Sequence, residues 1–303
     1  MNNESIHPFM DKEEDCQLAL FAAKWPDGFR CPHCSHPHAA VIRTRRLPLY
    51  QCRSCRLQTS LIASTIMEGS RTSLTKWFQA IHLHSLPSGI SASRLSRIIN
   101  VTYKTAWLIC HKIRHAMSSS EDSRRLAGLV RINASLYGRY ESAHSDFPSM
   151  QVPLLIAASI GPHGEPEHMK IKLMKEFAQR KSITMQGVHT FIENHLSDDS
   201  LAEVIGTQSF YRLRKLRCPI LKQTVQEARV WIRDTFQGIG PKHLQVYLDQ
   251  FIWMLNARKT AENHPFDTLL SLSASLPVIT YPVLIGKYPN SAQIRSRPQS
   301  KAA

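Results

Sequence analysis

The sequence predicts a multidomain α+β protein, and three observations lead to this fold class. Two Cys-x-x-Cys motifs lie close together near the N-terminus. Segments with the hydrophobic spacing of amphipathic helices follow them. After a polar run, strand-like apolar segments come first and then alternate with helical ones, which indicates a mixed α/β sheet. The 303 residues are enough for two or three domains of ordinary size.

The first element that we expect is a short amphipathic helix over residues 11–24, within an N-terminal segment of residues 1–27. Its beginning is rich in acids, as the helix dipole favours. Pro26 and Gly28 end it. No run of about 20 apolar residues is present, so the sequence predicts no membrane span and no membrane partner.

Residues 28–68 contain four cysteines in two closely spaced pairs: Cys31, Cys34, Cys52 and Cys55. Two Cys-x-x-Cys pairs at this separation can close a tetrahedron of thiolates around one structural Zn²⁺ ion, with a short hairpin between the pairs. A redox dithiol needs only one pair in a thioredoxin-like context. Nothing marks the chain as secreted, so a disulfide framework is also disfavoured. We therefore predict a zinc ribbon.

Positive charge is concentrated in residues 28–117, which hold thirteen Lys and Arg side chains against one acid, Glu68. This segment supplies most of the net charge of +15. Such a cluster is the electrostatic signature of a nucleic-acid-binding surface. Around the ribbon, the arginines that we expect to contact phosphates are Arg43, Arg45, Arg46, Arg53 and Arg56.

Residues 69–117 predict a helix-turn-helix unit. A first helix follows Ser73, a second is capped by Ser91, and a third is capped by Thr102 and runs to about Met117. A short helix, a tight turn and a helix with a basic outer face form the pattern whose second helix enters the DNA major groove. The outer-face residues that we expect to contact DNA are Tyr103, Lys104, Thr105, Lys112 and Arg114.

The polar run that begins at Ser118 predicts a linker over residues 118–126. Residues 127–270 form the α/β domain. The strands predicted there cover 129–132, 152–160, 169–173 and 201–205, and the helices cover 183–195, 225–235 and a segment opened by Pro241. Residues 271–303 have little pattern and are expected to be a tail.

Several motifs of the chain closely resemble one family of proteins. They are Trp25–Pro32, Gln58–Ser60, Trp77–Phe78, Gly89–Ala92, Tyr103–Trp107, Pro241–Gln245, Tyr247–Asp249 and Asn256. Together they resemble insertion-sequence DDE transposases with an N-terminal zinc ribbon, the ISXO-type group related to Merlin elements. The resemblance covers roughly residues 16–270 and is more specific in the first half.

The resemblance implies a ribonuclease-H-like α/β domain in which two Asp and a Glu, or an Asn in its place, hold two Mg²⁺ ions. Two such metals activate the attacking oxygen and stabilise the leaving oxygen of a phosphodiester. Carboxylates are the ligands that Mg²⁺ prefers. The implied DNA partner is the terminal repeats of a related element. Transposases act as multimers, and palindromic ends would favour a homodimer.

The chain departs from the family at all three acids. Asn133 stands at the first Asp, Ile205 at the second and Lys222 at the third acid. A gapped alignment would instead bring Glu227, or the Asp198–Asp199 pair, to the later positions, but residues 127–140 contain no carboxylate for the first.

We therefore expect a cytoplasmic, nucleoid-associated protein that binds double-stranded DNA. Structural zinc is its cofactor, and its catalysis is lost, so that it acts as a regulator or an inactive transposase. One alternative is an active transposase that carries out Mg²⁺-dependent DNA cleavage and strand transfer. Another is a zinc-stabilised protein-interaction module whose basic surface binds an acidic partner. Whether the protein is an enzyme stays open at this point.

Overall fold

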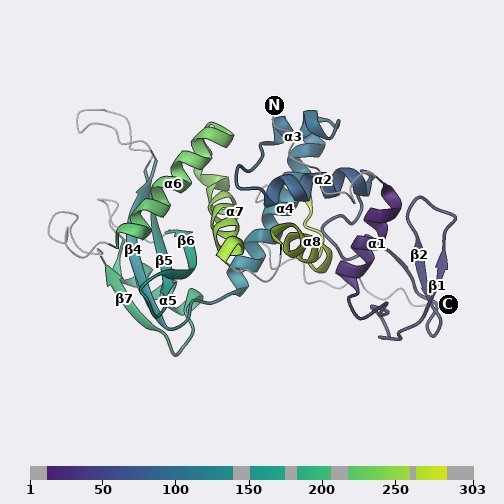
Figure 1. Cartoon of the computed structure of the whole chain (residues 1–303), viewed down its shortest axis with the longest axis horizontal. Helices are drawn as coiled ribbons and strands as arrows, with labels where there is room; N and C mark the ends of the chain where they lie inside the picture. Colours follow the sequence, from purple (N-terminus) through teal and green to yellow (C-terminus); the bar gives the residue numbers. More distant parts are fainter. Residues whose placement is uncertain (1–11, 139–150, 175–182, 206–217, 260–263, 285–303) are drawn as a thin grey trace.

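The computed structural model describes residues 12–138, 151–174, 183–205, 218–259 and 264–284. A small three-stranded sheet lies at one end, a four-stranded mixed sheet lies at the other, and helices connect them (Figure 1). No helix in these described ranges is long and apolar enough to cross a membrane.

The small sheet comprises β1 (Ala39–Ile42), β2 (Leu49–Cys52) and β3 (Gln58–Ser60), paired in antiparallel order. Helix α1 (Glu13–Lys24) packs beside it, in the position predicted for the N-terminal helix. An aromatic cluster of Phe21, Trp25, Phe29 and Tyr50, with ring centroids 5.1–5.9 Å apart, joins the helix to the ribbon. The ribbon is therefore anchored by packing as well as by its cysteines.

Helix α2 (Leu74–Ser85) begins after Ser73, as predicted, but its N-terminal cap comes from elsewhere in the chain. The Ser73 side chain caps nothing. Instead the Glu13 carboxylate accepts hydrogen bonds from the backbone N–H groups of Leu74 and Thr75 at 3.0 and 3.1 Å. An acid at this end also complements the helix dipole. Helices α1 and α2 are thus joined through one side chain.

Helices α3 (Ala92–Ile98) and α4 (Tyr103–Ser123) follow. Their predicted caps are confirmed, because the Ser91 and Thr102 side chains accept hydrogen bonds from Arg94 N and Thr105 N. The turn between the helices contains Asn100 in the left-handed region, with φ of 49°.

The linker predicted over residues 118–126 is wrong, because α4 continues through Ser123 and its last turns are packed. The Ser118 hydroxyl donates to Asp249 Oδ2 at 2.6 Å. Glu121 is buried, where its carboxylate accepts a hydrogen bond from Asn256 at 3.1 Å and its backbone carbonyl accepts one from Lys170. A run of polar residues looks like a linker in sequence. Here Ser118 and Glu121 form hydrogen bonds with residues of a later helix and of the strand that contains Lys170, which are distant in the chain.

The mixed sheet has the strand order β6-β5-β4-β7. Strands β4 (Leu129–Tyr137), β5 (Val152–Ile160) and β6 (Pro166–Leu173) form an antiparallel meander, and β7 (Leu201–Ile205) pairs parallel to β4. Helix α5 (Met185–His195) covers one face, while α6 (Pro219–Phe236) and α7 (Pro241–Lys259) cover the other. The strands and helices predicted for this region are confirmed, although β4, β6 and α6 are longer than expected and α5 begins two residues later.

Two side chains of α7 satisfy the backbone of the edge strand β6. Gln245 accepts a hydrogen bond from Leu173 N at 2.8 Å and donates to Ile171 O at 2.9 Å. Asn256 accepts from Met169 N and donates to Met169 O, both at 3.0 Å. Exposed edges of sheets invite pairing with other chains, and here a helix closes the edge instead. This arrangement explains the glutamine and asparagine of the C-terminal motifs.

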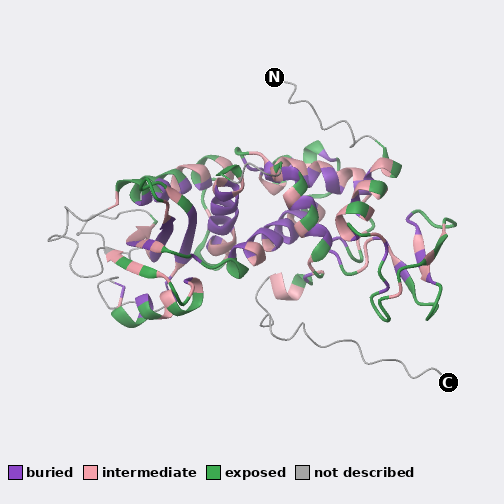
Figure 2. Ribbon diagram, turned by 60° about the horizontal axis from the view of Figure 1, so that its bottom comes forward, coloured by how far each residue is buried: buried purple, intermediate pink, exposed green. Residues whose placement is uncertain are grey.

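The C-terminal segment is helical where a tail was predicted. Helix α8 (Pro265–Ser275) crosses the boundary that the sequence placed between residues 270 and 271, and α9 (Tyr281–Leu284) follows. Helix α8 packs on α1, α2 and α4, and Ile66 N donates to Ser273 O at 3.1 Å. Its buried side chains join one core that runs from the ribbon to the sheet, so the predicted domains share their packing (Figure 2).

Candidate functional site

The four cysteines lie in two turns of the same local form. In the first, Cys31 N donates to His36 O at 3.1 Å and Ser35 N donates to Cys31 O at 2.9 Å. In the second, Cys52 N donates to Leu57 O at 2.9 Å and Arg56 N donates to Cys52 O at 3.1 Å. The residue after each pair, Ser35 or Arg56, adopts a positive φ. The β1–β2 hairpin brings the two turns together.

The resulting sulfur cluster fits a zinc ion. All four Sγ atoms lie within 4.8 Å of one another. The Sγ atoms of Cys31 and Cys55 are 3.5 Å apart, and those of Cys34 and Cys52 are 3.6 Å apart. A tetrahedron with Zn–S bonds of about 2.3 Å has edges of about 3.8 Å. Cys31, Cys34, Cys52 and Cys55 therefore form a potential structural zinc site whose four ligands are all from the protein.

The thiols also perturb one another. Burial raises the pKa of Cys52, but hydrogen bonds from nearby backbone groups and thiols outweigh it and lower that pKa to about 7. At Cys55 the backbone of Leu57 lowers the pKa, while burial and the other three thiols raise it to about 12. Sulfur atoms this close compete for protons, and a bound divalent cation takes the place of those protons.

The five ribbon arginines that the sequence predicted as phosphate contacts are all exposed: Arg43, Arg45, Arg46, Arg53 and Arg56. One of them has a partner within the protein, because Arg46 Nη1 lies 2.9 Å from Glu13 Oε1. The other four form no ion pair among the described residues. These four exposed side chains are therefore available to contact a polyanion.

The first turn of α4 also presents side chains outward. Tyr103 is 57% exposed, Lys104 is exposed and Thr105 is half-buried. In helix-turn-helix proteins the N-terminal residues of the second helix are those that contact base edges. The structure thus leaves the start of α4 accessible, and it buries most of the rest of this helix.

The outer-face position predicted for Lys112 and Arg114 is wrong, because these side chains are only 6% and 1% exposed. Lys112 Nζ lies 3.5 Å from Glu68 O and over the Trp77 ring, and burial lowers its pKa. Arg114 donates to Gln250 Oε1 at 2.8 Å and lies over the Tyr247 ring. A charged residue can point into a protein when distant elements supply its partners, which helical spacing alone does not reveal.

The three positions aligned with the family's acids come together in space. Asn133 in β4 and Ile205 in β7 are register partners in the parallel pair. Lys222, in the first turns of α6, lines the same pocket as Asn133. The Asn133 side chain also reaches the start of α6, since Nδ2 donates to Cys218 O at 3.3 Å.

The alternative acids lie elsewhere. Asp198 and Asp199 precede β7, whereas Asn133 pairs with the last residue of that strand. Strands rise about 3.3 Å per residue, so the start of β7 at Leu201 lies about 13 Å from Ile205, and these acids lie in the turn before that start. Glu227 is exposed, accepts a hydrogen bond from Gln223 and lines a different pocket.

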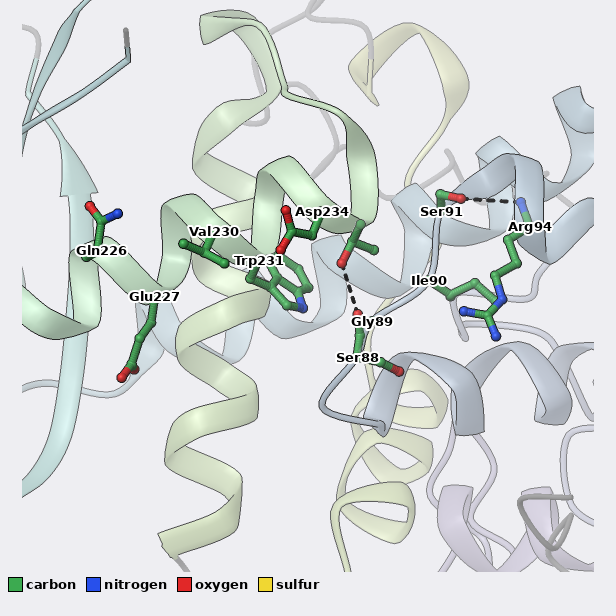
Figure 3. A pocket seen from close by; sticks show the side chains of 11 residues that line it. Ser88, Gly89, Ile90, Ser91, Arg94, Gln226, Glu227, Val230, Trp231 and Asp234 are labelled. Carbon is green, nitrogen blue, oxygen red and sulfur yellow. Dashed lines mark hydrogen bonds between the residues drawn. The ribbon is translucent and has the colours of Figure 1, made fainter. Parts of the chain in front are cut away.

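That second pocket, of about 660 Å³, lies between α6 and the loop that begins α3 (Figure 3). Gly89 faces Trp231 there, and a Cβ at this glycine would lie 2.6 Å from the indole ring. Trp231 Nε1 donates to Pro87 O at 3.2 Å, and the Thr235 hydroxyl donates to Ser88 O at 3.1 Å. These contacts explain the glycine of the Gly89–Ala92 motif, and they join the α/β part to the helical part.

Sequence reasoning missed Arg229 and Ser135, which line the pocket over Asn133 together with Lys222. A signal existed for Arg229, which follows Lys222 by two helical turns and therefore shares its face of α6. Ser135 follows Asn133 by two positions in β4 and therefore lies on the same face of the sheet.

One comparison with known proteins bears on these sites. A family model described as "Transposase zinc-ribbon domain" matches residues 11–58. This range contains α1, all four cysteines and the ribbon arginines. No curated protein and no solved structure gave a significant match to the chain. The match supports a transposase-type zinc ribbon and, with it, DNA binding.

Proposed function

We propose that this protein is a relative of insertion-sequence DDE transposases that binds double-stranded DNA and whose ribonuclease-H-like core has lost metal-dependent catalysis. The proposal rests mainly on the proximity of three positions that align with the metal-binding acids: Asn133 is the register partner of Ile205 and lines one pocket with Lys222. In such a core the first acid belongs in the first strand and the second at the end of a later strand. Asn133 and Ile205 occupy strand positions of this kind.

The residues present do not fit two Mg²⁺ ions. Such ions need anionic oxygen ligands, and two-metal chemistry holds both ions a few ångströms apart. Asn133 offers one neutral oxygen, Ile205 has no ligand atom and Lys222 repels cations. No Asp or Glu lines the pocket over Asn133 among the described residues. A ribonuclease-H-like domain without these acids would therefore keep its packed core but could not carry out metal-dependent DNA cleavage.

The DNA contacts that we propose come from the ribbon and from the start of α4. Arg43, Arg45, Arg53 and Arg56 would contact phosphates, and Tyr103, Lys104 and Thr105 would enter the major groove. Phosphate contacts supply affinity without sequence information, whereas groove contacts supply specificity. The proposed target is the terminal repeats of a related element, and a homodimer would suit palindromic repeats.

The test is a single set of reactions with zinc-loaded protein, Mg²⁺ or Mn²⁺, and duplex DNA carrying the ends of a related element. Binding and cleavage are followed together. We expect binding whose affinity falls steeply with salt, because phosphate contacts release counterions, and no cleavage or strand transfer. Binding that does not depend on salt would instead favour a protein-interaction module.

A matched pair of variants makes the test decisive. Asp198→Asn and Glu227→Gln remove the acids that a gapped alignment would use. Cleavage by the unaltered protein that disappears in either variant would show an active transposase and overturn the loss of catalysis. Lys104→Gln should weaken DNA binding in the same reactions.

A further inference from the structure

The pocket over Asn133 is a small polar cavity of about 190 Å³ between β4 and α6. Its polar lining residues are Asn133, Ser135, Lys222 and Arg229. Drug-sized ligands occupy pockets of about 300 Å³ or more. This cavity is therefore suited to a small polar ligand.

Two of the residues that line this cavity each have a buried polar atom without a hydrogen-bond partner in the described residues: Asn133 Oδ1 and Arg229 Nε. Asn133 is 5% exposed, and its amide orientation is set by the hydrogen bond from Nδ2 to Cys218 O. Buried polar groups are nearly always paired in proteins, and an unpaired one costs about 1–3 kcal/mol. An acceptor and a donor are thus both unpaired at one cavity.

The charge of the cavity is positive. Lys222 and Arg229 both line it, and no described lining residue is acidic. The nearby Arg131 is already paired with Glu203 at 3.1 Å, so Glu203 does not neutralise these two cations. Burial lowers the pKa of Arg229 below its usual value. An anion beside the guanidinium would offset that penalty.

We propose that this cavity binds a phosphate group that still has an ionisable hydroxyl, either inorganic phosphate or the terminal phosphomonoester of a nucleic acid. Its anionic oxygens accept hydrogen bonds from Lys222, Arg229 and Ser135. Its protonated oxygen donates to Asn133 Oδ1. The second pKa of a phosphomonoester is about 6, so the required protonated form is populated near neutral pH. A phosphodiester within a strand has no such proton and satisfies only the cations.

This proposal does not depend on DNA binding by the ribbon or by α4, because it rests on the cavity alone. It assigns a ligand to the place where the family resemblance puts catalytic metal ions. Replacement of three acids by Asn, Ile and Lys would then have exchanged a cation site for an anion site.

The test is isothermal titration calorimetry of the full-length, zinc-loaded protein with inorganic phosphate at pH 6.5. Lys222→Gln should weaken phosphate affinity about tenfold, as expected for the loss of one charge-assisted hydrogen bond. Lys222 is exposed, so the variant should fold. The matched control is Arg233→Gln, which removes one positive charge further along α6 outside the cavity and should leave affinity unchanged.

Asn133→Asp provides a second, nearly isosteric variant. Its carboxylate would repel phosphate and pair with Arg229, so phosphate binding should disappear while the far-UV circular dichroism spectrum stays the same. No measurable phosphate binding by the unaltered protein would overturn the proposal. So would equal affinities for the unaltered protein, Lys222→Gln and Asn133→Asp.

A final pair of titrations distinguishes the two sources of phosphate. Thymidine dinucleotides with and without a 5′-phosphate are too short to span the ribbon and α4. Tighter binding of the phosphorylated dinucleotide, lost in Lys222→Gln, would identify a DNA end as the ligand. Equal binding of both dinucleotides, alongside binding of inorganic phosphate, would identify free phosphate as the ligand of the same cavity.

Discussion

Arg114 gives the sharpest test of the structure, because helical spacing put it on the face predicted to bind DNA and the tertiary structure buries it. Its guanidinium donates to Gln250 Oε1 at 2.8 Å and to Ile90 O at 3.2 Å. It also lies 4.2 Å from the centroid of the Tyr247 ring and 5.2 Å from that of Phe236. These partners tie α4 to α7 and to the loop before α3.

Replacement of Arg114 by Met keeps much of the side-chain volume and removes both hydrogen bonds. Two buried acceptors then lose their partner, at about 1–3 kcal/mol each. The aromatic contacts add about 1 kcal/mol or more when desolvated. We expect the free energy of unfolding to fall by about 3–5 kcal/mol, in the range found when a buried charged network is broken.

The assay is urea unfolding of the zinc-loaded protein followed by far-UV circular dichroism, with DNA affinity measured below the unfolding transition. The control is Lys104→Gln at the exposed start of α4. It should change stability by less than about 0.5 kcal/mol and lower the salt dependence of DNA binding by about one counterion. An Arg114→Met protein with unchanged stability and weakened DNA binding would refute the buried role and restore the outer-face prediction.

Three other predictions follow from the contacts described above. Cys34→Ser should abolish stoichiometric zinc binding, measured by atomic absorption, because a closed tetrahedral site needs all four thiolates; retention of one zinc per chain would contradict the assignment. Gly89→Ala should lower the free energy of unfolding by about 1–3 kcal/mol and shift tryptophan fluorescence, since Trp231 occupies the Cβ position; an unchanged emission spectrum would argue against this packing. Burial, aided by Arg114, lowers the pKa of His84 to about 3. The unfolded state therefore binds the proton more readily, and the stability that neutral His84 contributes above pH 6.5 should fall by about 2.7 kcal/mol by pH 4.5; urea unfolding of the unaltered protein and of His84→Gln at both pH values isolates this contribution from those of His111 and His195, and pH profiles that run parallel in the two proteins would exclude a buried neutral imidazole.

Local features of the chain were predictable from the sequence. The doubled Cys-x-x-Cys spacing predicted the four residues whose sulfur atoms lie within 4.8 Å of one another, because each turn is short and self-contained. The caps at Ser91 and Thr102 were predictable for the same reason, since each bond spans three residues. Strand β7 was predicted with its observed limits from its apolar, turn-bounded run.

Features that depend on distant partners were not predictable. The cap of α2 is Glu13, about 60 residues earlier in the chain, and not the adjacent Ser73. Glu121 and Lys170 face each other between α4 and β6, so a polar run became buried helix rather than linker. Helix α8 packs on α1, α2 and α4. The weak hydrophobic pattern of its own sequence did not predict this packing.

The sequence by itself determined three features of this protein: a cysteine cluster suited to zinc, a basic segment over residues 28–117, and the lack of any Asp or Glu over residues 127–140. Short-range spacing and residue chemistry are sufficient for such statements. Only the tertiary structure decided which charged side chains face solvent. It also decided that Asn133 pairs with Ile205 and lines a pocket with Lys222. Burial and convergence depend on how separate elements pack, and that packing brings together residues far apart in the chain.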